Sequence, residues 1–323
     1  MKVFPTTAIQ EIVPDAPTYV QPFTRLAEQD RFGAHRVVDD PEEADIILFL
    51  DGHQHNRDLD LTAIRNHPLV RAHRNKSFIY NEQDQPWCAM PGLYAAMPKG
   101  SLNPRWQRAC AYLTLPNPYV VFGQASGREP DLLFSFMGRR GNRTRDRILC
   151  LSHPRAYIAD TSAVDFFRAP CKEMDRQKQQ YAEIVARSRF VLCPRGAGPG
   201  SFRIFETMVG GRVPVILSDS LAPPRGPVWE DCAVFVKERD IDKIPAILEK
   251  REERFQQMAL AARREWEQWF APDVLFHRMT EELKDILESR RAPESVLGRK
   301  LNLRYLRLRL RAAVGVLRNT PPH

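Results

Sequence analysis

The sequence predicts an α/β protein with two facing Rossmann-like domains, each built around a parallel sheet. In the first half, apolar runs alternate with a helix-compatible stretch: ADIILFLDG (44–52), DLDLTAIRNHPLVRAH (58–73) and KSFIYNEQD (76–84). The alternation restarts at DLLFSFMG (131–138) and continues through SRFVLCPRG, SFRIFETMVGG and RVPVILSD. Buried strands separated by helices are typical of parallel sheets with helical crossovers, and two such series predict two domains.

We expect the first domain to span residues 1–125 and the second 126–272, with C-terminal helices and a basic tail at 273–323. Residues 86–120 are rich in Pro, Trp and Tyr, which favours an irregular connection between the domains. The apolar run at 228–236, VWEDCAVFV, is expected to add a further strand to the second sheet.

The composition limits the possible classes of protein. Hydrophobic residues make up 43% and charged residues 27%, a balance typical of globular proteins. The net charge of +8 favours anionic partners such as nucleotides, but the basic residues are dispersed and no nucleic-acid motif is present, so we expect no nucleic-acid partner. The six cysteines form no Cys-x-x-Cys pair and are interpreted as reduced thiols. Without a signal-peptide pattern or a long apolar stretch, a cytoplasmic location is expected.

The basic tail has two interpretations. Leucines and arginines alternate in LGRKLNLRYLRLRLRAAVGVLR at 297–318. A basic amphipathic segment can lie on an anionic bilayer, which predicts peripheral membrane contact through residues 299–318. Packing of the leucines on the domain is an equally good interpretation.

The most informative stretch is Ser188–Asp219. An apolar strand ends at Pro194, and a loop with three glycines leads to Ser201, which is expected to cap a helix. Those glycines are Gly196, Gly198 and Gly200. Glycine-rich backbone before a helix N-terminus offers free N–H groups to a phosphate, and Arg195 and Arg203 flank this loop.

Glu206 is expected to contact the ribose of a bound nucleotide. It follows Ser201 by five residues, which is roughly 7 Å along a helix and suits a carboxylate that accepts hydrogen bonds from ribose hydroxyls. Alternatively, Arg203 and Glu206 pair with each other on one helix face. Phe202, Phe205 and Val209 are expected to face the core.

Four arginines follow the strand that ends at Gly138: Arg139, Arg140, Arg143 and Arg145. Ligands of open α/β sheets bind at the carboxyl ends of strands, so one or two of these arginines are expected to reach a diphosphate, and Arg139 and Arg143 are the two selected. The alternative is a solvated, arginine-rich helix start.

Residues 188–219 resemble the exostosin family, glycosyltransferase family 47. The similar motifs are S-x-F-x-L-C-P-x-G at 188–196, S-x-R-x-x-E at 201–206 and G-x-x-P-V-I-x-x-D at 211–219, with weaker similarity at 134–147 and 41–50. The resemblance implies a GT-B fold and inverting transfer from a UDP-sugar, bound by the second domain, to a glycan or lipid-linked saccharide. UDP-sugar would be a co-substrate, and no cofactor is expected.

By position, the resemblance implies that Glu206 is the ribose-contacting acid and that Arg203 and Ser201 lie on the phosphate side. Fixed arginines would stabilise the leaving diphosphate without a metal. We expect the protein to differ from animal members of the family in having no membrane anchor and no second catalytic domain, and its N-terminal half is short.

A general base for the acceptor hydroxyl is expected at the strand ends of the first domain. The candidates selected are Asp51, His53 and Glu82, with Asp51 favoured; Asp84 and His55 lie beside them. Two other patterns carry less weight. His53 and His55 are too few for a metal site, and Asp58-Leu-Asp60 resembles the metal motif of other transferases in a context that does not need it. No metal is therefore expected.

Three aromatic residues, Trp87, Tyr94 and Trp106, suit either a shelf for a sugar ring or the core. Two alternative functions remain open. One is a non-catalytic protein that binds nucleotides or anionic polymers, and the other is a GT-B transferase that uses a GDP-sugar.

Overall fold

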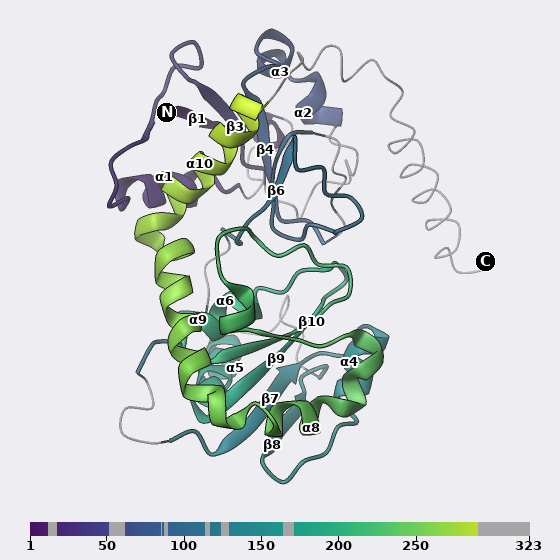
Figure 1. The fold of residues 1–323 in the computed structure, drawn as a ribbon. Helices are drawn as coiled ribbons and strands as arrows, with labels where there is room; N and C mark the ends of the chain where they lie inside the picture. Colours follow the sequence, from purple (N-terminus) through teal and green to yellow (C-terminus); the bar gives the residue numbers. More distant parts are fainter. Residues whose placement is uncertain are drawn as a thin grey trace, which may run out of the picture.

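The computed structural model describes residues 1–11, 18–51, 62–84, 86, 90–113, 117–123, 129–163 and 171–289. Within these residues the chain forms two domains, each with a fully parallel sheet, lying one above the other in Figure 1. The predicted fold class, two Rossmann-like domains in the GT-B arrangement, is confirmed.

The first domain contains a six-stranded sheet of order β2-β1-β3-β4-β5-β6. Its strands are β1 (Lys2–Thr6), β2 (Arg36–Val37), β3 (Ile46–Phe49), β4 (Ser77–Asn81), β5 (Gly92–Tyr94) and β6 (Gln107–Ala109). Its helical segments are η1 (Ile9–Glu11), α1 (Val20–Glu28), α2 (Thr62–Asn66) and α3 (Pro68–Ala72). Every residue of β3 and β4 is buried, as expected for central strands of a parallel sheet that is covered on both faces.

The prediction that residues 86–120 form an irregular connection was partly wrong. Two three-residue strands, β5 and β6, extend the first sheet there. Gly92 makes the first of them possible: its φ is +152°, and a Cβ atom at this position would lie 2.0 Å from the carbonyl oxygen of Ile79. Only glycine allows so close an approach of β5 to β4.

The second domain contains a five-stranded sheet of order β11-β10-β9-β7-β8. Its strands are β7 (Leu132–Gly138), β8 (Ala156–Asp160), β9 (Ser188–Pro194), β10 (Val213–Leu217) and β11 (Val234–Phe235). Its helical segments are α4 (Arg143–Ile148), α5 (Cys171–Arg187), α6 (Arg203–Val209), α7 (Trp229–Cys232), η2 (Glu238–Lys243), α8 (Ile244–Glu249), η3 (Glu252–Arg254) and α9 (Phe255–Trp269). The strand expected over 228–236 is only the two residues of β11, because Trp229 and Cys232 are buried three positions apart in a helical turn.

The last described helix, α10 (Pro272–Ser289), returns to the first domain and packs against α1 (Figure 1). The rings of Phe23 on α1 and Phe276 on α10 meet edge to face at 5.2 Å. Near its end, Asp285 accepts a hydrogen bond from Arg108 of β6 at 2.5 Å and from Arg225 of the second domain at 2.7 Å. The helix therefore connects both domains through shared ion pairs.

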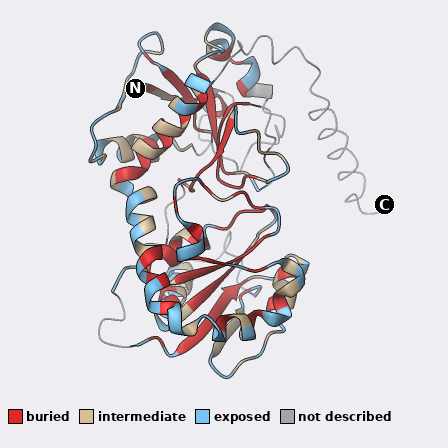
Figure 2. Ribbon diagram, viewed as in Figure 1, coloured by how far each residue is buried: buried red, intermediate tan, exposed pale blue. Residues whose placement is uncertain are grey.

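The two domains also contact each other directly. The main chain of residues 97–99 bonds to that of residues 220–222, with Lys99 donating to Ser220 at 2.7 Å and Ala222 donating to Met97 at 2.9 Å. One apolar cluster includes buried residues of both domains, and red buried backbone continues between the sheets in Figure 2. Apolar residues of both domains thus pack against each other at the interface.

Among the described helices, none has the length and apolar character needed to cross a membrane. The tail prediction for residues 299–318 lies outside the described residues.

Candidate functional site

The glycine-rich loop between β9 and α6 lies at the carboxyl end of the second sheet and faces the first domain. Its ends are joined by a hydrogen bond from the Gly196 amide to the Gly200 carbonyl at 3.4 Å. Asn142, which caps α4, donates to the carbonyls of Arg195 and Gly196 at 3.3 and 3.0 Å. The start of α4 therefore fixes the position of the loop.

The glycines of this loop allow close contact between the domains. A Cβ atom on Gly198 would lie 1.8 Å from the backbone carbonyl oxygen of Asp84, and one on Gly200 would lie 2.1 Å from the Tyr112 hydroxyl. At Gly196 a Cβ atom would make only ordinary contacts, at 3.7 Å to the Asp84 carboxylate and 3.8 Å to Arg145. In this arrangement Gly198 and Gly200 pack against the first domain, whereas Gly196 lies between two charged side chains.

Two arginines beside the loop have no carboxylate partner among the described residues. Arg145 donates to the carbonyls of Arg195 and Arg139 at 3.2 and 3.3 Å. Arg203 donates to the carbonyl of Met137 at 3.3 Å, and its Nε is buried without a hydrogen-bond partner. Burial, and next the charge of Arg203, lower the pKa of Arg145 to about 10. Two neighbouring positive charges in partly buried positions, neither in an ion pair with a described carboxylate, favour an anionic ligand.

Of the other arginines near the loop, Arg195 and Arg140 are paired and Arg143 is exposed, whereas Arg139 is half-buried with no carboxylate partner among the described residues. Arg195, predicted to grip phosphate, bonds Glu238 at 3.0 Å, and Arg140 bonds Asp160 at 2.7 Å. Of the two arginines selected from the cluster after β7, Arg139 contributes its carbonyl to Arg145, and Arg143 is exposed on the first turn of α4. The structure thus brings Arg203 together with Arg145, which the sequence did not distinguish from its neighbours.

The helix after the loop begins later than expected. Phe202 is the N-cap of α6 and no side chain caps the helix, so Ser201 does not have its predicted capping role. Its Oγ is buried and lacks a hydrogen-bond partner. Phe202, expected in the core, is 49% exposed and lies edge-on to Tyr112 of the first domain.

Glu206 is deeply buried and faces protein groups. Its Oε1 accepts a hydrogen bond from the Asn117 amide at 2.9 Å, and burial, opposed by Asn117 and Arg203, raises the pKa of the carboxyl. Within the described part of the chain no ion pair joins Arg203 to Glu206, so the alternative of a simple helix pair is not observed. The contact of Glu206 with a ribose stays a prediction.

The raised pKa of Glu206 predicts a pH-dependent stability. A carboxyl with a raised folded-state pKa binds its proton more tightly in the folded than in the unfolded chain. Its contribution to the free energy of unfolding is therefore favourable at low pH and is lost as pH rises through the folded pKa. Glu206→Gln keeps an acceptor for Asn117 and cannot ionise. We expect the variant to melt higher than the wild type at about pH 8, with the difference shrinking towards about pH 4.

Melting curves across this pH range check the prediction, with Glu183→Gln on the exposed face of α5 as the control. A difference between Glu206→Gln and wild type that does not change with pH would contradict it.

The predicted first-domain bases lie in different surroundings. The Oδ1 of Asp51 accepts from the Thr7 hydroxyl and the amides of Ala8 and Ile9 at 2.7, 2.9 and 2.6 Å, which holds the segment after β1. Its Oδ2 is buried without a hydrogen-bond partner, and burial raises the pKa of this carboxyl. Glu82 is buried and accepts from the Tyr80 hydroxyl and the Leu113 amide.

Several candidates lie outside the described residues, namely His53, His55, Asp58, Asp60 and Trp87. Of the aromatic residues, Tyr94 is fully buried in the first-domain core, with its hydroxyl donating to Met90 at 2.7 Å, which is the core interpretation. Among the described residues, one group has the geometry to hold a metal ion, and it does not include the glycine-rich loop: His35, His277 and Glu281.

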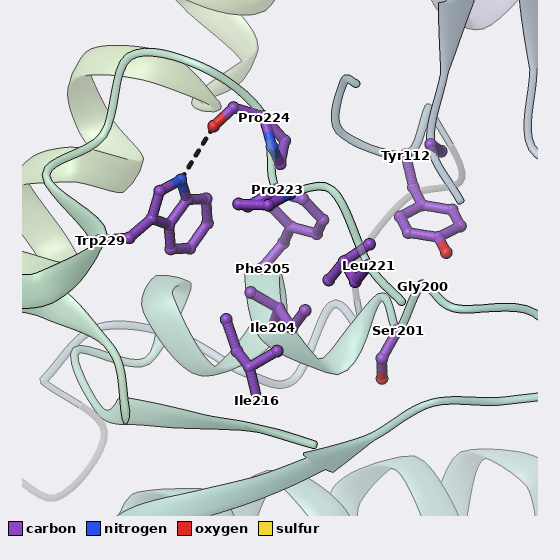
Figure 3. A pocket seen from close by; sticks show the side chains of 11 residues that line it. Tyr112, Gly200, Ser201, Ile204, Phe205, Ile216, Leu221, Pro223, Pro224 and Trp229 are labelled. Atoms are coloured by element: carbon purple, nitrogen blue, oxygen red, sulfur yellow. Dashed lines mark hydrogen bonds between the residues drawn. The ribbon is translucent and has the colours of Figure 1, made fainter. Parts of the chain in front are cut away.

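A small apolar cavity lies between the domains beside Gly200 and Ser201 (Figure 3). Its lining includes Tyr112 of the first domain and Phe205 and Trp229 of the second, with the Trp229 indole donating to the Pro224 carbonyl at 2.9 Å. It contains no arginine or carboxylate. This cavity is a gap in the packing between the domains. The position suited to an anionic ligand is at Gly196, Arg145 and Arg203.

Sequence reasoning did not single out Arg145, Asn142 or Asn117. The sequence does contain one signal for Arg145, which is its position three residues after the N-cap Asn142. The Arg145 amide donates to the Asn142 side chain, and the Arg145 side chain points back to the loop. Asn117 lies 89 positions before Glu206, and no motif in the sequence relates the two.

Fold and site together define a two-domain Rossmann-like protein with an arginine-lined loop at the domain interface. Residues 65–251, more than half of the chain, match the model of the Exostosin GT47 domain. The chain belongs to this family.

Similar curated proteins include an Exostosin-1 homolog of Caenorhabditis elegans, 38% identical over 156 residues, which are 41% of this chain and 40% of that protein. A probable glucuronosyltransferase of Oryza sativa subsp. japonica is 43% identical over 70 residues, 21% of this chain and 17% of that protein. A probable beta-1,4-xylosyltransferase, IRX10 of Arabidopsis thaliana, is 40% identical over 70 residues with the same coverage. The chain thus spans less than half the length of these relatives.

Among solved structures, the chain is similar to Anabaena HepE in complex with UDP-glucose. The TM-score is 0.44 at 11% identity, covering 88% of this chain and 99% of that one.

Proposed function

We propose that this chain is a glycosyltransferase that moves a sugar from a UDP-sugar to a glycan or lipid-linked saccharide by direct displacement with inversion. The observation that carries the proposal is the pair Arg145 and Arg203, partly buried, without carboxylate partners among the described residues, and adjacent to a glycine-rich loop at the carboxyl edge of the second sheet. Ligands of open α/β sheets bind at this edge.

The charge of this pair suits the reaction. In the transfer, an acceptor oxygen bonds to the anomeric carbon while the bond from that carbon to the diphosphate breaks, and the UDP leaves with the electron pair. The negative charge that develops on the leaving diphosphate can be stabilised by the guanidinium groups of Arg145 and Arg203. Backbone carbonyls already hold these groups in place, so they need little reorganisation. No metal is invoked, and the donor is the co-substrate.

Family membership supports the same donor class. Relatives carry the names glucuronosyltransferase and xylosyltransferase, which are descriptions of those proteins, and for this chain they favour a nucleotide-linked sugar over an anionic polymer as the ligand. The identity of the sugar, a cytoplasmic location and membrane contact through residues 299–318 remain predictions.

Nucleotide selectivity tests the proposal. We expect saturating UDP, at about 100 times its Kd, to stabilise the folded chain by about 2.7 kcal/mol, because only the folded protein holds the loop and its arginines together. The proposed UDP-sugar donor predicts much smaller effects of GDP and CDP at the same concentration. Thermal shift measures this effect. Incubation with UDP-glucuronic acid, UDP-xylose and UDP-glucose, each with xylotetraose or cellotetraose, then shows whether a glycosylated product and UDP form in equal amounts.

Other outcomes separate the alternatives. Preferential stabilisation by GDP would indicate a GDP-sugar transferase. Binding of RNA or anionic polysaccharide with a steep salt dependence and no nucleotide preference would indicate a polymer-binding protein instead.

A further inference from the structure

Asp84 reaches the arginine site from the opposite domain. It follows the end of β4 by three residues, where the Asn81 side chain accepts from the Gln83 amide at 2.9 Å and turns the chain. Its backbone carbonyl contacts Gly198 so closely that no Cβ atom would fit there. Its carboxylate Oδ1 lies 3.7 Å from the Cβ position of Gly196. Both parts of Asp84 therefore face the loop.

The Asp84 carboxylate lies near Arg145 without forming an ion pair with it. Arg145 Nη2 lies 3.8 Å from the same Cβ position of Gly196, and the charge of Asp84 acts to raise the pKa of Arg145. Within the described part of the chain no ion pair joins the two, and Asp84 is exposed. An exposed carboxylate can be reached by an acceptor hydroxyl.

Its neighbours at this edge of the first sheet are engaged differently. Asp51 uses one oxygen for three donors of its own domain, and Glu82 accepts from Tyr80 and Leu113 inside the core. The Tyr112 hydroxyl near the loop is held neutral, because burial and the charges of Glu82 and Asp84 raise the pKa of this phenol. Of the three carboxylates Asp51, Glu82 and Asp84, only Asp84 is exposed and contacts the second-domain loop.

We propose that Asp84 is the general base of the transfer, a role that rests on the proposed function. As the acceptor oxygen bonds to the anomeric carbon and the bond from that carbon to the diphosphate breaks, the Asp84 carboxylate takes the proton of the acceptor hydroxyl. The electron pair of the broken bond stays with UDP. The base thus comes from the first domain and the leaving-group arginines from the second.

Asp84→Asn tests this role because it removes the proton acceptor and keeps the shape of the side chain. We expect kcat for sugar transfer to fall by at least about 100-fold, the usual minimum for a general base, while the Kd for UDP changes by less than about threefold. Asp84→Glu, which keeps a carboxylate, is expected to retain more activity than Asp84→Asn. Asp175→Asn on the exposed face of α5 is the control for the change in charge.

The outcomes distinguish two failures. If Asp84→Asn keeps wild-type kcat, or loses UDP binding in parallel with turnover, Asp84 is not the base although the proposed function stands. If the wild-type protein neither binds UDP nor transfers sugar from the UDP-sugars named above, the proposed function fails and the role of Asp84 fails with it.

Discussion

Replacing Arg203 with alanine is expected to weaken UDP binding by about 10- to 100-fold, and replacing Arg145 is expected to do the same. A hydrogen bond to a charged group contributes about 1.5–3 kcal/mol, and about 1.4 kcal/mol corresponds to a factor of ten in affinity. Neither guanidinium has a carboxylate partner among the described residues, so both are free to meet a diphosphate. The double variant is expected to lose measurable binding, as determined by calorimetric titration with UDP.

Arg143→Ala is the matched comparison for this series. Arg143 lies on the same short helix as Arg145 but is exposed, so its removal should change the Kd for UDP by less than about threefold. Arg203→Lys keeps the charge and loses the planar guanidinium group, so its Kd for UDP should lie between those of wild type and Arg203→Ala. Equal effects of Arg143→Ala and Arg145→Ala would show that general surface charge, rather than this pair, attracts the nucleotide.

The sequence predicts the architecture well because each long strand carries its own signal. Runs such as IILF in β3 and FVLC in β9 are apolar on both faces, which is typical of a parallel sheet covered on both sides. The strands β5 and β6 escape prediction since they are three residues long and stand among prolines and aromatics. What makes β5 a strand is contact with β4 at Gly92, which is tertiary information.

The candidate site is predicted less completely than the fold, for a related reason. The motif around Gly196 and Arg203 is continuous in sequence and is correctly located at the carboxyl edge of the sheet. The partners of each charge come from distant segments, as Glu238 does for Arg195 and Asn117 does for Glu206. Which arginines remain available to a ligand depends on these pairings, so the position of Arg145 three residues after the N-cap Asn142 is a signal that becomes decisive only once the pairings are known.

Adding a single methyl group at Gly198 is expected to disturb the contact between the domains. A Cβ atom there would lie 1.8 Å from the Asp84 carbonyl oxygen and 2.6 Å from its Cα, and backbone on both sides leaves no flexible side chain to move aside. Overpacking of this kind costs about 1–3 kcal/mol. Gly198→Ala should therefore lower the melting temperature, and it should lower kcat by about tenfold or more if Asp84 has to approach the loop for transfer.

Comparison within the loop isolates this steric effect. Gly196→Ala meets its neighbours only at 3.7 and 3.8 Å, and Gly100→Ala in the first domain meets nothing within 4 Å, so both should keep wild-type melting temperature. Gly200→Ala should have an intermediate melting temperature. The Cβ atom would lie 2.1 Å from the end of the Tyr112 side chain, which can rotate, and 3.2 Å from the Ala96 backbone. If Gly198→Ala melts and turns over like Gly100→Ala, the two domains do not need this close contact. The base of one domain and the arginines of the other would then have to meet in a different arrangement.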